Sequence, residues 1–180
     1  MSTVRQISFV LALVAVSLPA FAQHHASLTS AEVDQLRDAA QEPNDRLKLY
    51  LKFLRERLAG LEEIRTNPKI TDRPTQIHDH LQDFLDLYDE MNDNVDTFVD
   101  RKDDVRKPLK AILEADPEFL QKINTYQAEL QADKADTKSY AFVLSNIVDE
   151  LKSSVDDHRQ LMQEQEEAAK HRKKKKHESE

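Results

Sequence analysis

Apolar residues recur along this chain at alternating spacings of three and four, the pattern of helices that pack against one another along their length. The first such run predicts a helix over 30–66, opened by a capping box of Thr29 and Glu32. Pro43 interrupts the run, either as a kink or as the first residue of a new helix. The apolar face after this proline consists of Leu47, Leu51, Leu54, Leu58 and Leu61.

The second run has the cleanest alternation. It extends from Ile77 to Phe98, is interrupted by Lys102, and resumes at Val105. The pattern then passes Pro108 without losing phase, so this proline predicts either a kink or a tight restart of the helix.

The length of this second run requires a break. A continuous helix over 75–133 would be ~88 Å long at ~1.5 Å per residue and would lack neighbours along much of that length. Asp116 and Pro117 have the residue types of a helix N-cap and a first helical residue, so we expect a boundary at this pair. A last helix over 137–169 follows, with His158 at a position of its apolar face.

These elements predict an all-α fold. Breaking the second run allows the chain to fold back, giving an antiparallel up-down four-helix bundle with coiled-coil-like heptad packing and short connections. An elongated three-helix bundle with a protruding arm is the alternative.

The composition narrows the chemistry. Gly60 is the only glycine, and loops that cradle phosphates or turn strands into hairpins depend on glycine for positive φ. The chain has no cysteine, which excludes thiol nucleophiles, iron–sulfur clusters, c-type haem and cysteine-based zinc sites. We therefore expect no catalytic residues and no enzymatic activity.

Three segments are expected along the chain. Residues 1–22 have a basic Arg5, an apolar core and an Ala-Phe-Ala site, the pattern of a cleaved signal peptide. Residues 23–169 form the helical domain, which carries 19 Lys/Arg against 32 Asp/Glu. Residues 170–180 carry six Lys/Arg against two Glu, and we expect this basic tail to be disordered or frayed. The protein is then periplasmic or secreted, with no transmembrane segment after cleavage.

Aspartates repeat on one side of the second helix and are candidate metal ligands, above all Asp93 and Asp96. Carboxylate oxygens suit hard cations, but a calcium site converges about six or more oxygens from a bent loop, which a straight helix does not provide. A row that is solvated or paired with a neighbouring helix is the alternative. Basic residues that lie along the first helix are Lys48, Lys52 and Arg55.

Histidines are the other candidate ligands. On a regular helix His78 and His80 point about 200° apart and cannot hold one ion together, but a frayed helix start just after Pro74 would change this. His158 occupies a position otherwise filled by apolar residues, which is typical of a partly buried, hydrogen-bonded histidine. Small exported bundles resembling cytochrome b562 bind haem between a Met and a His, and Met91 with His158 is similar to that pair. Those proteins place the Met near the chain start, and this chain does not.

Residues 28–32 resemble the L-T-x-x-Q motif of Spy- and CpxP-type periplasmic chaperones, which are exported, helical and free of catalytic apparatus. The resemblance covers five residues of one copy, and the last position is Glu32 where the motif has Gln. It implies a periplasmic stress or chaperone role. The capping box explains the same residues through helix initiation alone.

The sequence thus predicts an exported, non-catalytic helical protein that acts as a structural or interaction module at the cell envelope or outside the cell. A periplasmic metal or haem carrier and a Spy/CpxP-like chaperone are the alternatives, and no cofactor is expected. The expected partner is another protein or a second copy of the chain. The tail from Lys170 to Lys176 is a candidate contact for an anionic surface. Nucleic acid is not expected, because the domain is acidic and the tail has no aromatic residues for base stacking.

Overall fold

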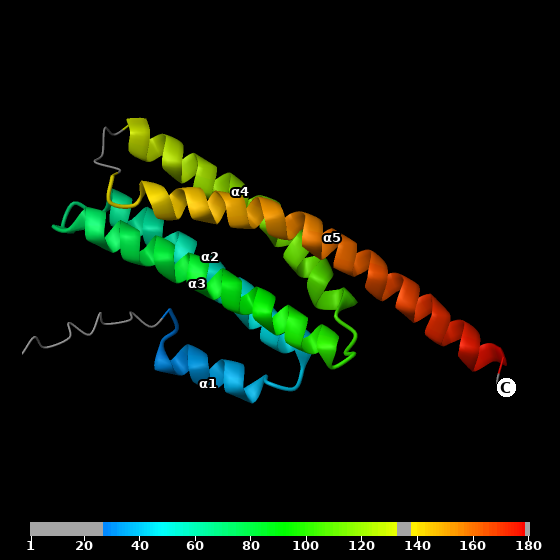
Figure 1. Ribbon diagram of the computed structural model, residues 1–180. Coiled ribbons are helices and arrows are strands. Elements are labelled where there is room, and N and C mark those ends of the chain that lie inside the picture. The colour runs from blue at the N-terminus through cyan, green and yellow to red at the C-terminus, as the bar shows by residue number, and fades with distance from the viewer. Residues whose placement is uncertain (1–26, 133–137, 179–180) are drawn as a thin grey trace, which may run out of the picture.

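A computed structural model describes residues 27–132 and 138–178, and in these residues the chain is all-helical. The predicted all-α class is therefore confirmed (Figure 1). Five helices follow one another along the chain: α1 (Ser30–Asp38), α2 (Pro43–Thr66), α3 (Arg73–Asp100), α4 (Arg106–Ala132) and α5 (Ala141–Glu178). The predicted signal peptide, 1–22, lies outside the described residues.

The start of α1 confirms the predicted capping box. The Thr29 hydroxyl accepts from the Glu32 N–H at 3.3 Å, and the Glu32 carboxylate accepts from the Thr29 N–H at 2.7 Å. Pro43 is the first residue of α2, where its missing N–H costs nothing. The predicted helix over 30–66 is therefore two helices, of which α1 is the shorter.

The boundary expected at Asp116 and Pro117 is wrong. The helix α3 instead ends at Asp100, and Lys102 takes a left-handed conformation with φ 65°. The Lys102 N–H donates to Val99 C=O at 2.8 Å, and the Asp103 N–H donates to Phe98 C=O at 3.0 Å. These two bonds form a Schellman motif, which satisfies carbonyl groups at the helix end.

Pro108 and Pro117 both lie in α4. Pro108 is its third residue, so the tight restart is the alternative that the structure shows. Pro117 lies inside the helix. The tertiary contacts of α4 override the local preference, because Asp116 is fully buried between other helices and cannot act as an exposed cap.

Lys102→Gly is expected to raise the free energy of unfolding. A non-glycine residue in the left-handed region costs about 1–2 kcal/mol, and glycine avoids that cost. Glycine also loses more backbone entropy on folding, which offsets part of the gain. We expect a net gain of roughly 0.5–1 kcal/mol in urea denaturation. Lys102→Ala is the control, since it removes the side chain and retains the strain. An equal gain in both variants would attribute the effect to the lysine side chain instead.

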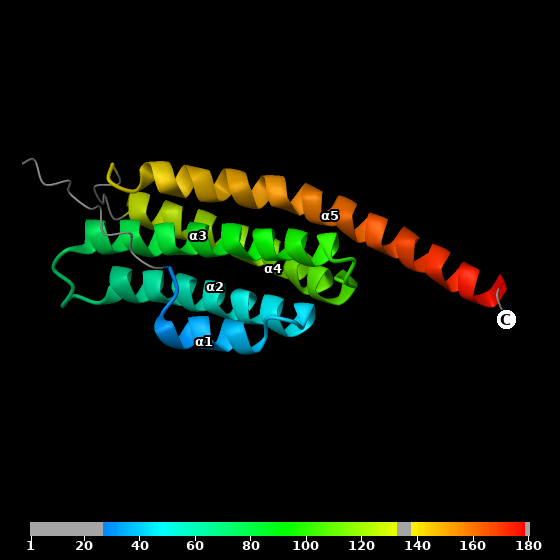
Figure 2. The ribbon, with the colours of Figure 1, turned by 60° about the horizontal axis from the view of Figure 1, so that its bottom comes forward.

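The four long helices pack in a closed set of pairs. The helix α2 packs on α3 and α4, while α5 packs on α4 and α3 (Figures 1 and 2). Their shared core consists of the predicted apolar faces, and residues such as Leu54, Phe84 and Ile112 are fully buried. The short α1 packs on α2 alone among the described helices.

A buried ion pair between Glu32 and Arg57 links α1 to α2. Glu32 is 7% exposed and lies 2.7 Å from Arg57, which also donates to Ser27 C=O at 2.8 Å. Burial disfavours the charged form of Glu32, but hydrogen bonds from Arg57 and Thr29 outweigh it and lower the pKa of the carboxyl group.

The helix α5 continues to Glu178, through the segment expected to be a disordered or frayed tail. Its terminal turns project beyond the turn between α3 and α4 (Figures 1 and 2). The residues from Gln163 onward are mainly Gln, Glu, Ala, Lys and Arg, all strong helix formers, without Gly or Pro. Across the described residues, the helices are too short or too polar to span a bilayer.

Candidate functional sites

A polar network lies inside the interface of α3, α4 and α5. The Tyr88 hydroxyl donates to Asp116 Oδ1 at 2.8 Å, and His158 Nδ1 lies 3.0 Å from Asp116 Oδ2. Asp116 is 0% and His158 4% exposed. Burial and the neighbouring Asp116 raise the pKa of the Tyr88 hydroxyl, so this group acts as a neutral donor.

A second group of hydrogen bonds borders this network. Asn92 Nδ2 donates to Glu150 Oε1 at 3.3 Å and to Ser154 Oγ at 3.2 Å. The Ser154 hydroxyl donates to the same Glu150 oxygen at 2.9 Å. These groups line a groove between α3 and α5, of about 370 Å³, which His158 also lines.

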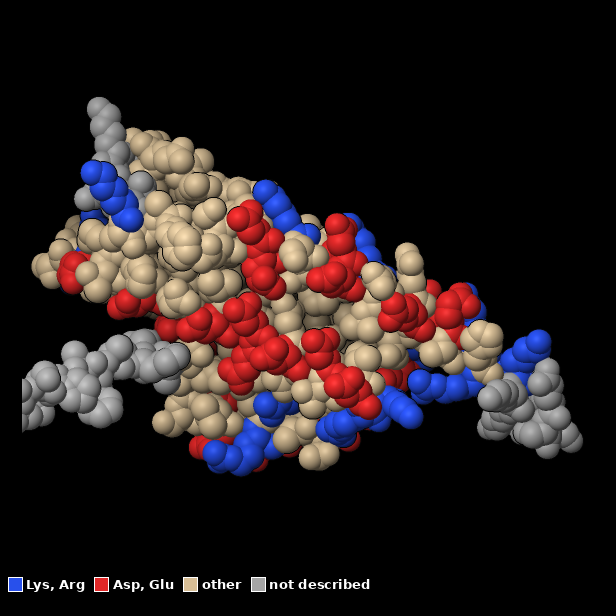
Figure 3. All heavy atoms as spheres, viewed as in Figure 1, with Lys and Arg blue, Asp and Glu red and all other residues tan. Residues whose placement is uncertain are grey.

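Acidic residues surround this groove, and Figure 3 shows a band of carboxylates along α3 that continues on α5. The groove is lined by Asp96, Asp157, Glu150 and Glu164 among others. The aspartate row was predicted to be either solvated or paired with a neighbouring helix, and Lys52 and Arg55 form ion pairs with other residues. Lys52 lies 3.8 Å from Glu56 on its own helix, and Arg55 lies 3.1 Å from Glu118 on α4.

Asp89→Asn is expected to raise stability slightly at pH 7. Partial desolvation and the charges of Glu150, Asp86 and Asp93 raise the pKa of Asp89 to about 6. A carboxyl group whose pKa is raised on folding destabilises the fold above that pKa, and the penalty disappears as the pH falls toward the unfolded value. The gain should therefore be present at pH 7 and absent near pH 4. Because the side chain remains largely exposed, we expect a small change in Tm.

Asp149→Asn is the control for this variant, because Asp149 is exposed inside α5 and away from the helix ends. Melting curves of both variants and the unchanged chain at pH 7 and pH 4 distinguish the loss of the Asp89 charge from the effect of any exposed Asp→Asn substitution. A gain at Asp89 that persists unchanged at pH 4 would contradict the electrostatic explanation.

The other candidate ligands do not converge. Across the described residues no group of three or more His, Asp or Glu side chains is placed to hold a metal ion. His78 Nδ1 lies 3.3 Å from Asp79. His80 packs against Gly60 on α2, where a Cβ would lie 3.1 Å from the imidazole ring. Gly60 has a negative φ, so its role is close approach rather than turn formation.

Met91 and His158 are both buried, Met91 completely. Since His158 Nδ1 faces Asp116, only its Nε2 remains as a ligand atom. The imidazole is thus held by a carboxylate of the chain itself, which fits the hydrogen-bonded histidine that the sequence pattern favours.

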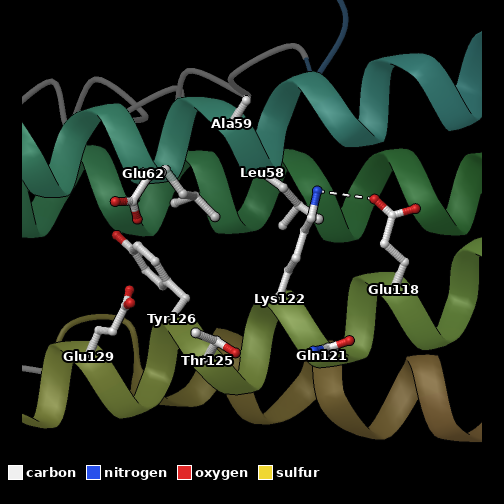
Figure 4. Close-up of a pocket in the computed structure, with 10 residues that line it drawn as sticks. Leu58, Ala59, Glu62, Glu118, Gln121, Lys122, Thr125, Tyr126 and Glu129 are labelled. Atoms are coloured by element: carbon white, nitrogen blue, oxygen red, sulfur yellow. Dashed lines mark ion pairs between the residues drawn. The ribbon is translucent and has the colours of Figure 1, made fainter.

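A different hollow, which sequence reasoning missed, lies between α2 and α4 (Figure 4). It has a volume of about 470 Å³, and Leu58, Ala59 and Leu61 supply its apolar wall. The polar residues that line it are Glu62, Glu118, Gln121, Lys122, Thr125, Tyr126 and Glu129. We refer to it as the α2–α4 groove.

The Tyr126 side chain is the unusual member of this groove. It is 6% exposed, and its hydroxyl has no hydrogen-bond partner among the described residues. Figure 4 shows the ring pointing from α4 toward Glu62 on α2. Burial raises the pKa of this hydroxyl, so the neutral O–H is left inside the protein.

Tyr126→Phe is expected to leave stability unchanged or to raise it by up to about 1–3 kcal/mol, because it removes a buried hydroxyl that makes no hydrogen bond. Tyr88→Phe is the matched comparison, since Tyr88 is also buried and donates to Asp116. A hydrogen bond to a charged group contributes about 1.5–3 kcal/mol, so this second variant should lose about 2 kcal/mol. Chemical denaturation measures both, and equal losses would show that the Tyr126 hydroxyl has a partner.

No protein-family model, no curated protein and no solved structure matches this chain.

Proposed function

We propose that this chain is an exported, non-catalytic binding protein. The helices α2–α5 form an antiparallel up-down four-helix bundle that serves as a scaffold, and the end of α5 contacts an anionic lipid surface. The closed set of helix pairs and the short connections between α2, α3 and α4 support the bundle. The signal-peptide pattern over 1–22 supports export.

The observation that carries this proposal is the length of α5. It has 38 residues, whereas α3 has 28, which at ~1.5 Å per residue makes α5 ~15 Å longer. Its terminal turns project from the bundle (Figure 2). A projecting helix gains little from packing, and short helices without tertiary partners are marginal in water.

The charge of the projecting turns indicates the partner. Lys170, Arg172 and Lys174 are exposed there, and the sequence adds further lysines up to Lys176. Basic segments of this kind are attracted to anionic lipid headgroups by about 1 kcal/mol per Lys or Arg, and salt weakens the attraction.

Sedimentation with phosphatidylglycerol vesicles tests the proposal. The full chain should sediment with anionic vesicles, less so as salt rises, and should remain in solution with phosphatidylcholine vesicles. A variant with Lys170, Arg172 and Lys174 changed to Gln should lose this association.

Changing Lys48, Lys107 and Lys110 to Gln is the control, since it removes the same number of exposed positive charges from the bundle. Unchanged vesicle association after the α5 substitutions, or equal loss in the control, would refute α5 as the contact surface.

A further inference from the structure

The unpaired Tyr126 hydroxyl is the observation that suggests a binding site in the α2–α4 groove. A buried hydroxyl without a partner costs about 1–3 kcal/mol relative to one that is satisfied. The chain retains this group at the edge of a hollow with an apolar wall (Figure 4). A bound molecule with a hydrogen-bond donor at this position would give the hydroxyl oxygen a partner, since a hydroxyl oxygen also accepts.

The end of the groove beside Tyr126 has an excess of negative charge. Glu62 and Glu129 lie there, and both approach the same guanidinium group: Arg65 is 2.7 Å from Glu62 and 3.3 Å from Glu129. One cation therefore serves two carboxylates, and this end complements a positively charged group.

The opposite end has an excess of positive charge. Glu118 lies 3.1 Å from Arg55 and 3.1 Å from Lys122, so two cations share one carboxylate. The hydrogen bond from Arg55 lowers the pKa of Glu118, which keeps this carboxylate ionised. With one positive charge in excess, this end complements a carboxylate.

The dimensions of the groove limit what fits between these ends. Lys122 and Glu129 are seven residues apart on α4, which is ~10 Å at ~1.5 Å per residue. The volume of about 470 Å³ is in the range of sites for small molecules. Leu58, Ala59 and Leu61 line the hollow and suit an apolar chain.

We propose that the α2–α4 groove binds a small zwitterion with an apolar body, its ammonium group between Glu62 and Glu129 and its carboxylate beside Lys122. The ammonium group donates to the Tyr126 hydroxyl oxygen and to the two carboxylates. The apolar body covers Leu58 and Leu61. Two sources share this chemistry: a linear ω-amino acid, and a short apolar peptide, which spans ~10 Å at about three residues.

Titration calorimetry on the full chain tests this site with four probes: 8-aminooctanoate, the tripeptide Ala-Leu-Ala, octanoate and octylamine. One or both zwitterions should bind at one molecule per chain. Octanoate and octylamine, which each lack one charge, should bind at least about tenfold more weakly, a difference of about 1.4 kcal/mol. The preference between the two zwitterions identifies the source.

Two variants link binding to the groove. Tyr126→Phe and Glu129→Gln should each weaken binding of the preferred zwitterion by about tenfold or more. Glu114→Gln is the matched control, because Glu114 is exposed on α4 away from the groove. Circular dichroism establishes that each variant is folded.

Three results would overturn the proposal: binding of neither zwitterion, octylamine or octanoate binding as tightly as the zwitterion, or equal weakening by Glu114→Gln. Vesicle association is measured separately and does not depend on this groove, so the two proposals stand or fail independently.

Discussion

Asp116→Ala is expected to lower the free energy of unfolding by about 2–6 kcal/mol, because it removes the shared acceptor of two buried polar groups, and each such group costs about 1–3 kcal/mol when it is left unsatisfied. Asp116 is completely buried and is the acceptor shared by Tyr88 and His158. The substitution leaves two buried polar groups facing a small cavity. Urea denaturation monitored by circular dichroism measures the loss.

The control for this variant is Asp156→Ala on α5. Asp156 is exposed and lies 3.1 Å from Arg159, so we expect a change within about 0.5 kcal/mol. A loss below about 1 kcal/mol for Asp116→Ala would contradict a buried, hydrogen-bonded carboxylate.

Replacing Tyr88, Asp116 and His158 together tests whether the intact network stabilises the fold or whether only a broken network is costly. Buried ionic groups exchanged together for apolar residues of similar size often cost little. The triple variant Asp116→Leu, His158→Leu and Tyr88→Phe should therefore be more stable than Asp116→Ala alone. A triple variant less stable than the single one would mean that the network itself stabilises the fold.

Pro117→Ala is expected to raise the free energy of unfolding, whereas Asp116→Ala lowers it. Proline inside a helix costs about 3 kcal/mol, since it has no N–H for the carbonyl of Leu113 and its ring crowds the preceding turn. The substitution also loses about 1 kcal/mol of stability, because proline restricts the conformations of the unfolded chain and alanine does not. The net gain should be about 2 kcal/mol, and the exposed Pro117 ring leaves no cavity behind.

Pro43→Ala is the control, since Pro43 is the first residue of α2 and breaks no helical hydrogen bond. This variant should be neutral or slightly less stable. If thermal melts show no gain for Pro117→Ala, then α4 does not carry the cost of an interior proline at this position.

The confirmed capping box at Thr29 and the wrong helix boundary at Asp116 show which features the sequence could predict. The capping box is local, because its donors and acceptors are three residues apart, and the structure confirms it. The boundary at Asp116 was wrong because an aspartate suits both a helix N-cap and a buried, hydrogen-bonded position. The spacing held the correct signal: Asp116 lies four residues after Ile112 and three before Phe119, which continues the apolar pattern through the proline.

The true helix boundary was hidden for a related reason. A glycine at position 102 would have marked a helix end, but Lys102 adopts the left-handed conformation without that signature. His158 was singled out from its polar character in an apolar row, whereas its partner Asp116 on α4 depends on tertiary packing. The unpaired Tyr126 hydroxyl could not be predicted either, because the sequence shows a regular apolar position and not the missing donor or acceptor.

The pairing of helices that are neighbours along the chain has consequences for how the protein folds. The helix α2 packs on α3, and α4 packs on α5, so much of the interface joins segments close in sequence. Chains rich in such local contacts lose little loop-closure entropy and fold rapidly, in microseconds to milliseconds. Each pair of neighbouring helices can form early, and the core closes when the two pairs dock. Docking also brings Asp116 on α4 to Tyr88 on α3, and both groups must lose bound water before their hydrogen bond forms.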